Sequence, residues 1–334
     1  MRACYQVHTH RDPKQVQRLV STLTRSSPDC VVVISHDRRG PALDVARLAR
    51  LGDVHVLAAE GGYGDWTHVQ RYLDVADYLD ERGIDYDWMA NLSGFDYPVM
   101  SVRAAEAELA ASGVDGFLHT FPVASPSAPW PPHRSRSRYW YRYRRFAELS
   151  PRAMRVLRPL QAVNRVQPIV RVTVSFGLSA GVRTGTPFGP GLKCFGGSFW
   201  CTLSRVAVER IREFTMRRPD VVAHYQRTLA PDESYVHTVL GNQPDITLAP
   251  DSLRYIDFRA TRFNHPRTLT AADVPTVTAS GAHFARKWDM QRTPEAYDLL
   301  DTAVLTPYDA HRAPLAGNDH SAHRAALARN DPVK

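Results

Sequence analysis

Residues 196–214 read GGSFWCTLSRVAVERIREF, and residues 230–242, after a polar spacer, read APDESYVHTVLGN. In the first stretch a glycine pair opens an apolar run, and Ser204 can cap the helix that follows it. In the second stretch apolar residues recur at helical spacing, and Gly241-Asn242 marks the end of that helix. These two stretches therefore predict two helices, the first of them preceded by an apolar run. We expect the rest of the chain to be organised around them.

The second stretch also carries the first candidate for chemistry. Glu233 is expected in the first turn of the short helix, where the helix dipole favours an ionised carboxylate. An ionised carboxylate on a rigid element suits a general base. Spacing alone leaves a second interpretation open, in which Asp232 and Glu233 are only the acidic residues that commonly start a helix.

The order of the pieces resembles a known family. GGSFWCTLSR followed by PDESYVHTVLGN is similar to the core of glycosyltransferase family 14, and the chain resembles a bacterial-type member of that family. That family holds the core-2 and I-branching β-1,6-N-acetylglucosaminyltransferases and the protein xylosyltransferases, and PDESYVHTVL is nearest the latter. Further matches follow in the same order over roughly residues 5–290. The resemblance implies a GT-A-like (Rossmann-like) α/β fold, an inverting mechanism and Glu233 as the catalytic base.

The composition is that of an ordinary soluble enzyme. The chain has 334 residues, 43% of them hydrophobic and 23% charged, which is enough to bury a full core. The first residues, MRACYQVHTHRD, lack the apolar region of a signal peptide, and no apolar run is long enough to span a membrane. The four cysteines lack metal-like spacing. We therefore expect a cytoplasmic protein with free thiols.

The net charge of +8 is concentrated in one segment. Between Arg134 and Arg158 there are nine arginines against one acid, Glu148, with aromatic residues between them. Such a segment can grip phosphates, RNA or an acidic acceptor. Because no nucleic-acid motif accompanies it, a solvated basic face or an acceptor-side loop is the preferred interpretation, and no nucleic-acid partner is expected.

Strand and helix signals alternate through the first 120 residues. Alternation of this kind predicts a mixed, mostly parallel sheet with helices on both faces. Strands are expected at residues 3–7, 30–34, 54–57, 88–92 and 116–119, with helices between them. We predict one GT-A-like domain over residues 1–290, with an irregular basic, proline-rich acceptor-side segment at 121–190. Residues 291–334 are expected to form a polar C-terminal extension.

Three polar residues follow predicted strands, at the sheet edge where ligands gather in such folds. The resemblance implies that His8 and Asp37 hold the nucleoside and that Asp96 shapes the donor floor. Without the resemblance, a core histidine and a turn acid would explain His8 and Asp37 as well. The sequence Asp85-Tyr86-Asp87 precedes the strand at 88–92. Its carboxylates are therefore expected at the opposite edge, and we predict neither a metal nor another cofactor.

Without a metal, cationic side chains must neutralise the leaving diphosphate. The segments FNHPRTLTAADV and SGAHFARKWD supply Arg267 and Lys287, with Arg286 as an additional candidate. Both segments resemble the family's late basic pair, which implies that they bind the donor phosphates. Arginine grips phosphate in a planar, bidentate manner, whereas lysine acts as a compact charge.

The acceptor side is less defined. Trp130 and Trp200 can each stack on a sugar face, and Trp130, in a proline-rich loop, is the better candidate because Trp200 has the spacing of a core residue. The prediction is transfer of a sugar, N-acetylglucosamine in the first place, from a UDP-sugar to a hydroxyl of a glycan or small-molecule acceptor. The alternatives are a UDP-xylose-dependent xylosyltransferase and a non-catalytic carbohydrate- or RNA-binding module. The sequence does not indicate an oligomeric state.

Overall fold

Successive residues of the first two strands point alternately into two separate apolar cores. In the computed structural model, which describes residues 1–259 and 266–306, Cys4 and Val31 belong to one core, whereas Tyr5 and Val32 belong to the other. Both sets are buried. Apolar residues on both faces are typical of a parallel sheet that is covered on both sides.

The central sheet has seven strands in the order β11-β6-β10-β4-β1-β2-β3. β1 pairs in parallel with β2 and β4, and β2 pairs in parallel with β3. β10 lies antiparallel between β4 and β6. The mixed, mostly parallel α/β architecture predicted from the sequence is confirmed. The strands are β1 (Ala3–Thr9), β2 (Val31–Asp37), β3 (Asp53–Ala59), β4 (Trp88–Ser93), β6 (Gly116–Pro122), β10 (Phe195–Ser204) and β11 (Leu248–Ala249).

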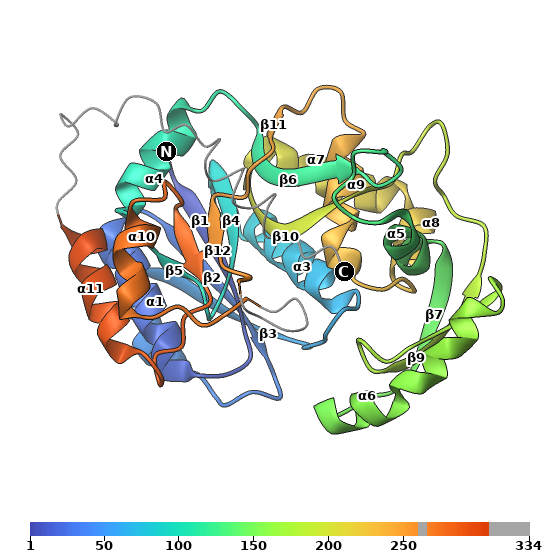
Figure 1. Ribbon diagram of the computed structural model, residues 1–334. Helices are drawn as coiled ribbons and strands as arrows, with labels where there is room; N and C mark the ends of the chain where they lie inside the picture. The colour runs from blue at the N-terminus through green and yellow to red at the C-terminus, as the bar shows by residue number, and fades with distance from the viewer. Residues whose placement is uncertain (260–265, 307–334) are drawn as a thin grey trace.

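Helices cover both faces of this sheet (Figure 1). One face packs against α3 (Thr67–Glu81), α7 (Arg205–Arg217), α8 (Pro219–Tyr225) and α9 (Tyr235–Gly241). The other face packs against α1 (Pro13–Ser26), α4 (Val102–Ala111), α10 (Val274–Thr278) and α11 (Pro294–Leu305). The remaining short helices outside the basic segment are α2 (Val45–Ala49), η2 (Pro231–Glu233) and η3 (Ala271–Asp273).

A second, three-stranded sheet lies beside the first and has the order β12-β13-β5. Its strands are β12 (Arg254–Ile256), β13 (Phe284–Arg286) and β5 (Tyr97–Pro98). β5 follows β4 after a tight turn, and β13 pairs antiparallel with it. This pairing brings residues near 286 next to the turn that holds Asp96.

The C-terminal part of the chain adds to the packed domain. Tyr297 and Leu300 of α11 are fully buried in the core that also contains α1. The packed domain therefore continues through α11 and does not stop at residue 290, where the extension was expected to begin. The rest of that extension, residues 307–334, lies outside the described residues.

The segment 121–190 is more regular than the sequence indicated. It carries a third sheet, of order β7-β9-β8, with antiparallel pairing throughout. The expectation of an irregular segment was wrong, because the prolines stand at the end of β6, at helix starts and in connecting turns, and leave room for strands between them. Its elements are α5 (Pro132–Tyr139), β7 (Tyr141–Ala147), α6 (Pro151–Leu157), η1 (Arg158–Arg165), β8 (Val170–Thr173) and β9 (Leu178–Arg183).

All four cysteines are buried and unpaired, as predicted. Burial raises the pKa of each thiol, which keeps the cysteines protonated. Across the described parts of the chain, no helix combines the length and apolar character needed to cross a bilayer.

Candidate active site

Glu233 lies in a single turn of 3-10 helix, η2, directly before α9. Ser234 separates Glu233 from α9, so the prediction that Glu233 occupies the first turn of the α-helix was wrong. A proline at the first position of η2 and the left-handed backbone of Ala230 set this turn. The amide of Ala230 donates to the carbonyl of Gly64, and the Ser234 hydroxyl donates to the carbonyl of Phe195. These bonds fix the position of Glu233 between the loop before α3 and the start of β10.

Two arginines, and not the dipole of α9, face the Glu233 carboxylate. Arg138 Nη1 donates to Glu233 Oε2 at 2.5 Å, and Arg134 Nη2 lies 3.8 Å from the same oxygen. Burial lowers the pKa of Arg138, but attraction by Glu233 more than offsets this and leaves the pKa raised. The Glu233 side chain is 30% exposed. The Glu233 carboxyl group is therefore paired with an arginine but remains accessible to a substrate.

Trp130 supports these arginines. The guanidinium groups of Arg134 and Arg138 lie 4.9 and 5.1 Å from the centre of its ring, and Phe121 packs edge-on against it. Trp130 is only 6% exposed. Its ring is thus covered by two cations and does not form an open platform for a sugar. Its influence on an acceptor would act through the arginines.

Asp232 differs from Glu233 although the two are adjacent. Its Oδ1 is buried and has no hydrogen-bond partner among the described residues. Burial raises the pKa of Asp232 to about 7, and the neighbouring charge of Glu233 adds to the rise. At neutral pH a large fraction of Asp232 is therefore protonated.

A second group of charged side chains lies where β13 meets the turn after β4. Asp96 accepts hydrogen bonds from the amide and the hydroxyl of Ser93 and lies 3.8 Å from Arg286 Nε. Arg286 stacks 3.9 Å above Trp200, a half-buried residue. Lys287 Nζ lies 4.4 Å from the ring centre of Phe95. The structure therefore brings Asp96, Arg286, Lys287 and Trp200 together.

Burial lowers the pKa of both Arg286 and Lys287. Asp96 opposes this effect at Arg286, whereas the positive charges of Arg11 and Arg286 add to it at Lys287. Two cations that share one partly buried region are costly without a counterion. An anionic ligand such as a diphosphate would relieve that cost.

Arg267 is engaged elsewhere. Its guanidinium group bonds to Asp257 at 2.7 Å and to both oxygens of Asp273 at 2.5 and 2.8 Å. The hydrogen bond from Arg267 lowers the pKa of Asp273 to about 2. A backbone bond of 2.8 Å from Leu269 to Lys287 holds the Arg267 loop near the other cations. Arg267 would therefore have to exchange carboxylate partners to bind a phosphate.

The predicted nucleoside residues lie at the carboxyl ends of β1 and β2. His8 is buried, stacks parallel to His68 at 5.8 Å, and has no hydrogen-bond partner for either ring nitrogen among the described residues. Burial lowers its pKa, and Arg71 lowers it further, so the ring is neutral. Asp37 accepts three hydrogen bonds from Arg39, which lower its pKa to about 2.

Aromatic and histidine rings connect the two charged groups. His68 packs against Phe199 at 5.4 Å, Phe199 packs against Trp200 at 5.1 Å, and Arg286 covers Trp200. The described residues show no direct contact between Glu233 and Arg267, Arg286 or Lys287. A small hollow of about 10 Å³ lies near the cations, between the ends of β1 and β4. Its lining residues are Thr9, His10, Arg11, Asp12, Gly94 and Phe95.

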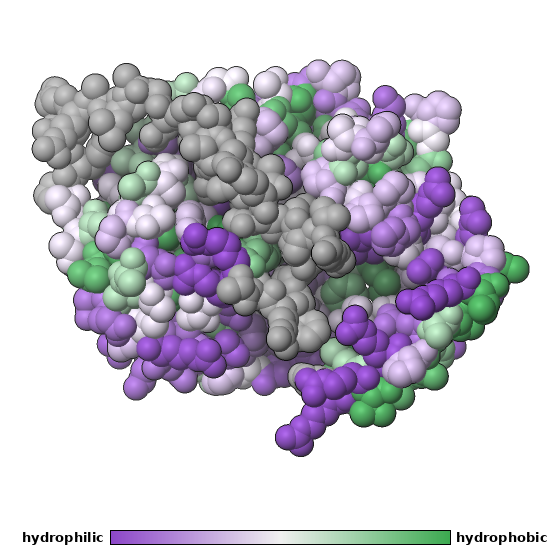
Figure 2. All heavy atoms as spheres, in the orientation of Figure 1, coloured by the Kyte–Doolittle hydropathy of each residue, from purple (hydrophilic) through white to green (hydrophobic). Residues whose placement is uncertain are grey.

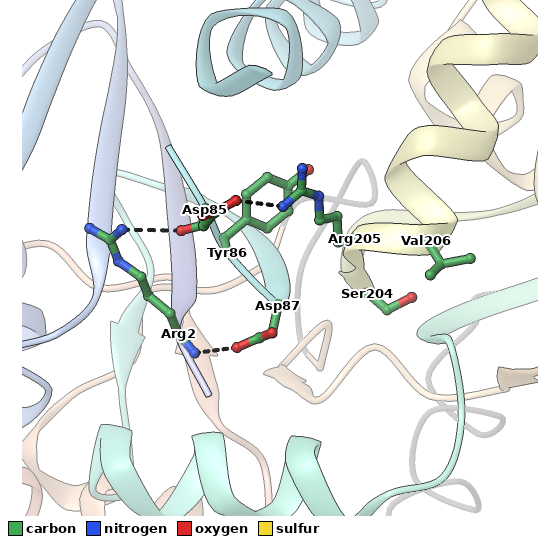
Figure 3. Close-up of a pocket in the computed structure, with 7 residues that line it drawn as sticks. All are labelled: Arg2, Asp85, Tyr86, Asp87, Ser204, Arg205 and Val206. Atoms are coloured by element: carbon green, nitrogen blue, oxygen red, sulfur yellow. Dashed lines mark hydrogen bonds and ion pairs between the residues drawn. The ribbon is translucent and has the colours of Figure 1, made fainter. Parts of the chain in front are cut away.

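The sequence Asp85-Tyr86-Asp87 lies at the other edge of the sheet, as predicted. Figure 3 shows Asp85 bonded to Arg2 and Arg205, and Asp87 bonded to the Arg2 backbone amide. The residues border a hollow of about 340 Å³ below the start of β4. In residues 1–259 and 266–306, no three His, Cys, Asp or Glu side chains gather as metal ligands. The absence of a metal in catalysis stays a prediction.

Sequence reasoning missed several residues of this region. Arg138, Asp232 and His68 were not candidates, although each contacts a predicted site residue or its neighbour. Arg71 was also missed; it bonds to Ser35 and to the carbonyl of Thr9 and so ties together the ends of β1 and β2. The basic segment 134–158 was the one signal that pointed towards Arg138.

The geometry defines an α/β domain with charged side chains gathered at the carboxyl ends of its parallel strands. A model of the Core-2/I-Branching enzyme family matches residues 1–278. The chain belongs to this family, which confirms the resemblance noted in the sequence.

Among curated proteins, the chain is similar to two from Arabidopsis thaliana. It is 28% identical over 243 residues to beta-glucuronosyltransferase GlcAT14A and 27% identical over 242 residues to beta-glucuronosyltransferase GlcAT14B. Each match covers 72% of this chain, but 47% and 49% of the respective relative. The chain thus spans about half the length of these relatives.

Solved structures are more distant. The galactosyltransferase LgtC, solved with donor and acceptor sugar analogues, aligns with a TM-score of 0.37 and 11% identity over 92% of this chain and 99% of its own. A nucleoside-diphosphate-sugar pyrophosphorylase from Vibrio cholerae aligns with a TM-score of 0.33 and 10% identity, covering 73% and 89% of the two chains. Scores this low support no inference about the site.

Proposed function

We propose that this chain is an inverting glycosyltransferase that moves a sugar from a UDP-sugar to an acceptor hydroxyl, with Glu233 as the general base. One observation carries the proposal: in a member of this family, the partly exposed Glu233 carboxylate stands beside two arginines and beside Asp232, whose pKa is raised to about 7. Such a carboxylate can accept a proton at neutral pH.

The proposed step is a direct displacement. The acceptor hydroxyl attacks the anomeric carbon, and its proton passes to Glu233. The bond from the anomeric carbon to the UDP oxygen breaks, and its electron pair stays on the diphosphate. Both arginine contacts seen in the described residues use Oε2 of Glu233. We therefore assign Oε1 to the acceptor hydroxyl.

Arg286 and Lys287 are the best-placed cations for the leaving diphosphate. Both are partly or fully buried beside one another, and their lowered pKa values indicate an unmet demand for negative charge. Asp96 would hold Arg286 in place below the donor. Arg267 would join them after release from Asp257 and Asp273. We propose that these side chains replace a metal ion.

His8 and Asp37 would face the nucleoside from the ends of β1 and β2. The two ring nitrogens of His8 are free to bond to a ligand within the described structure. Asp37 would have to share its carboxylate between Arg39 and a ribose hydroxyl. Trp200, under Arg286, lies close enough to the proposed phosphate site to contact the donor sugar.

The donor sugar is the open choice within this proposal. The sequence favoured N-acetylglucosamine, with xylose as the alternative. The names of the two Arabidopsis relatives add glucuronic acid as a candidate. Thermal-shift screening with UDP-N-acetylglucosamine, UDP-xylose and UDP-glucuronate separates them, because a tight ligand raises the melting temperature.

The variant Glu233→Gln tests the role of the base. It should bind UDP and the UDP-sugar as the wild type does, but lose sugar transfer by roughly 10²–10⁴-fold. Glu209→Gln, an exposed change on α7, is the matched control and should keep full activity. Near-normal turnover by Glu233→Gln would remove the assignment. Absence of UDP binding by the wild type would instead favour a non-catalytic binding module.

A further inference from the structure

A hairpin of short helices projects from the domain with its apolar side chains uncovered. It comprises residues 151–170, which form α6 and η1 and lead into β8. No residue of η1 is buried, and no described side chain of α6 is buried. In Figure 1 it lies at the far end of the third sheet, away from the central sheet.

The exposed apolar residues of the described chain concentrate here. Of fourteen large hydrophobic residues that are exposed, six lie within residues 151–170 and two more, Phe146 and Val182, lie in the adjoining strands β7 and β9. The most exposed residues of the hairpin are Val166 (80%), Val156 (75%) and Ile169 (62%). Figure 2 shows the hairpin as a green band along the lower right edge, bordered by purple side chains. A gathering of this kind on a soluble surface marks an interaction site.

Local hydrogen bonds nevertheless hold the backbone of the hairpin. Asn164 bonds through both atoms of its amide to the backbone of Val172, and Gln167 accepts from the amides of Ile169 and Val170. Ser150 caps α6 by accepting from the amide of Ala153. The apolar side chains are therefore exposed on a folded hairpin, in which polar side chains hold the backbone and the apolar side chains face outward.

Positive charge surrounds the apolar residues. Between residues 142 and 183 there are nine arginines and one acid, Glu148. Arg152, Arg155, Arg158 and Arg165 are exposed, and none of them has an ion-pair partner within residues 1–259 and 266–306. A helix with an apolar side and arginines around it is typical of a segment that lies in the interface of an anionic membrane.

We propose that the hairpin, defined as residues 151–170, docks this domain on the surface of a bilayer that contains anionic phospholipid. Valine and isoleucine side chains enter the headgroup boundary, and the arginines bind lipid phosphates. A second copy of the chain is a poorer partner, because it would set arginines against arginines. RNA is a poorer partner too, because aliphatic side chains offer bases no stacking surface.

This docking would also orient the proposed active site. β7, which leads to the hairpin, begins two residues after α5, the helix that carries Arg134 and Arg138. A domain that is bound to the membrane through its hairpin would present α5, with Arg134 and Arg138, to acceptors at the membrane surface. The docking itself does not depend on the proposed function, because it can be measured without donor or acceptor.

Vesicle flotation tests the proposal. The full chain should float with vesicles of phosphatidylcholine and phosphatidylglycerol and stay behind with phosphatidylcholine alone. The variant Val156→Ser with Val166→Ser should weaken binding about tenfold, the equivalent of about 1.4 kcal/mol. Arg155→Gln with Arg158→Gln should weaken it roughly fivefold for each arginine removed, from about 1 kcal/mol for each charge. High salt should weaken binding as well.

Matched changes on other surfaces are the controls. Val206→Ser with Met216→Ser on α7 and Arg50→Gln with Arg217→Gln remove exposed side chains of the same kinds. They should leave vesicle binding unchanged, and all four variants should melt as the wild type does. Equal binding to both vesicle types, or equal binding by hairpin and control variants, would overturn the proposal. So would a hairpin variant that instead loses self-association in light scattering or RNA retention.

Discussion

Asp232→Asn is the change that tests the electrostatics of the base most directly. The ordinary pKa of this carboxyl is 3.8, and in the folded chain burial and Glu233 raise it to about 7. Between pH 3.8 and about pH 7, Asp232 is deprotonated in the unfolded chain and protonated in the folded chain. Stability therefore falls as the pH rises from about 4 to 7 and then levels off. Asparagine has nearly the same shape and carries no charge, so the variant lacks this loss.

The size of the effect follows from the two pKa values. The difference between 3.8 and about 7 corresponds to roughly 4 kcal/mol. The residue is only half-buried, although Oδ1 is turned away from water. Partial solvent screening reduces the cost, and we expect about 2 kcal/mol. Asp232→Asn should thus resemble the wild type near pH 4 and be more stable by about 2 kcal/mol near pH 8.

Urea unfolding at several pH values measures this difference. Asp220→Asn is the control with the opposite sign, because the hydrogen bond from Arg218 lowers the pKa of Asp220. Its small contribution is present above its ordinary pKa and is lost as the pH falls. If the difference in unfolding free energy between wild type and Asp232→Asn stayed constant from pH 4 to pH 8, the raised pKa of Asp232 in the folded chain would be refuted.

Three further predictions concern the cations, the metal and the fold. Lys287→Gln should lower kcat/KM by about 10²–10³-fold and weaken UDP binding, whereas the exposed control Lys193→Gln should do neither. Steady-state assays and calorimetry with UDP check this pair. Transfer activity should persist in excess chelator, and a complete loss that manganese restores would refute the metal-free proposal. Ser204→Ala should reduce the free energy of unfolding by about 1 kcal/mol in urea, because Ser204 accepts the Ala207 amide at the start of α7.

Regular local patterns made much of the fold predictable. Mostly apolar runs of four or five residues predicted β1, β2, β3, β4 and β6, and the cap at Ser204 predicted the start of α7. The antiparallel insertion of β10 between β4 and β6 had no local signal, because strand order depends on long-range pairing. The third sheet was missed because the cluster of prolines at residues 122–132 is typical of an irregular loop. The last two of these prolines start the short helix α5, and the strands of the third sheet follow that helix.

The placement of three candidate residues at one edge of the sheet was predictable. His8 and Asp37 lie at the carboxyl ends of β1 and β2, and Asp96 lies in the turn after β4, so the sheet topology alone brings their backbones to one edge. Side-chain partners are a different matter. Arg138 and Glu233 are 95 residues apart and meet only because α5 packs against the turn before α9. No spacing pattern in the sequence connects these two residues. The sequence therefore suggested that the dipole of α9 provides the favourable electrostatic environment of Glu233, whereas in the structure Arg138 provides it.

The partners of each cation also decide how the diphosphate can be bound. Arg267 already satisfies two carboxylates, so a phosphate gains from it only what remains after those bonds are broken. Within the described residues Arg286 faces one carboxylate, that of Asp96 at 3.8 Å, and Lys287 lies beside it with a lowered pKa. Binding an anion here adds attraction without first losing a strong ion pair. We therefore expect the order of importance predicted from the sequence, with Arg286 last, to be reversed. Arg286 and Lys287 would make the main contacts to the phosphates, and Arg267 would contribute less because it must first leave Asp257 and Asp273.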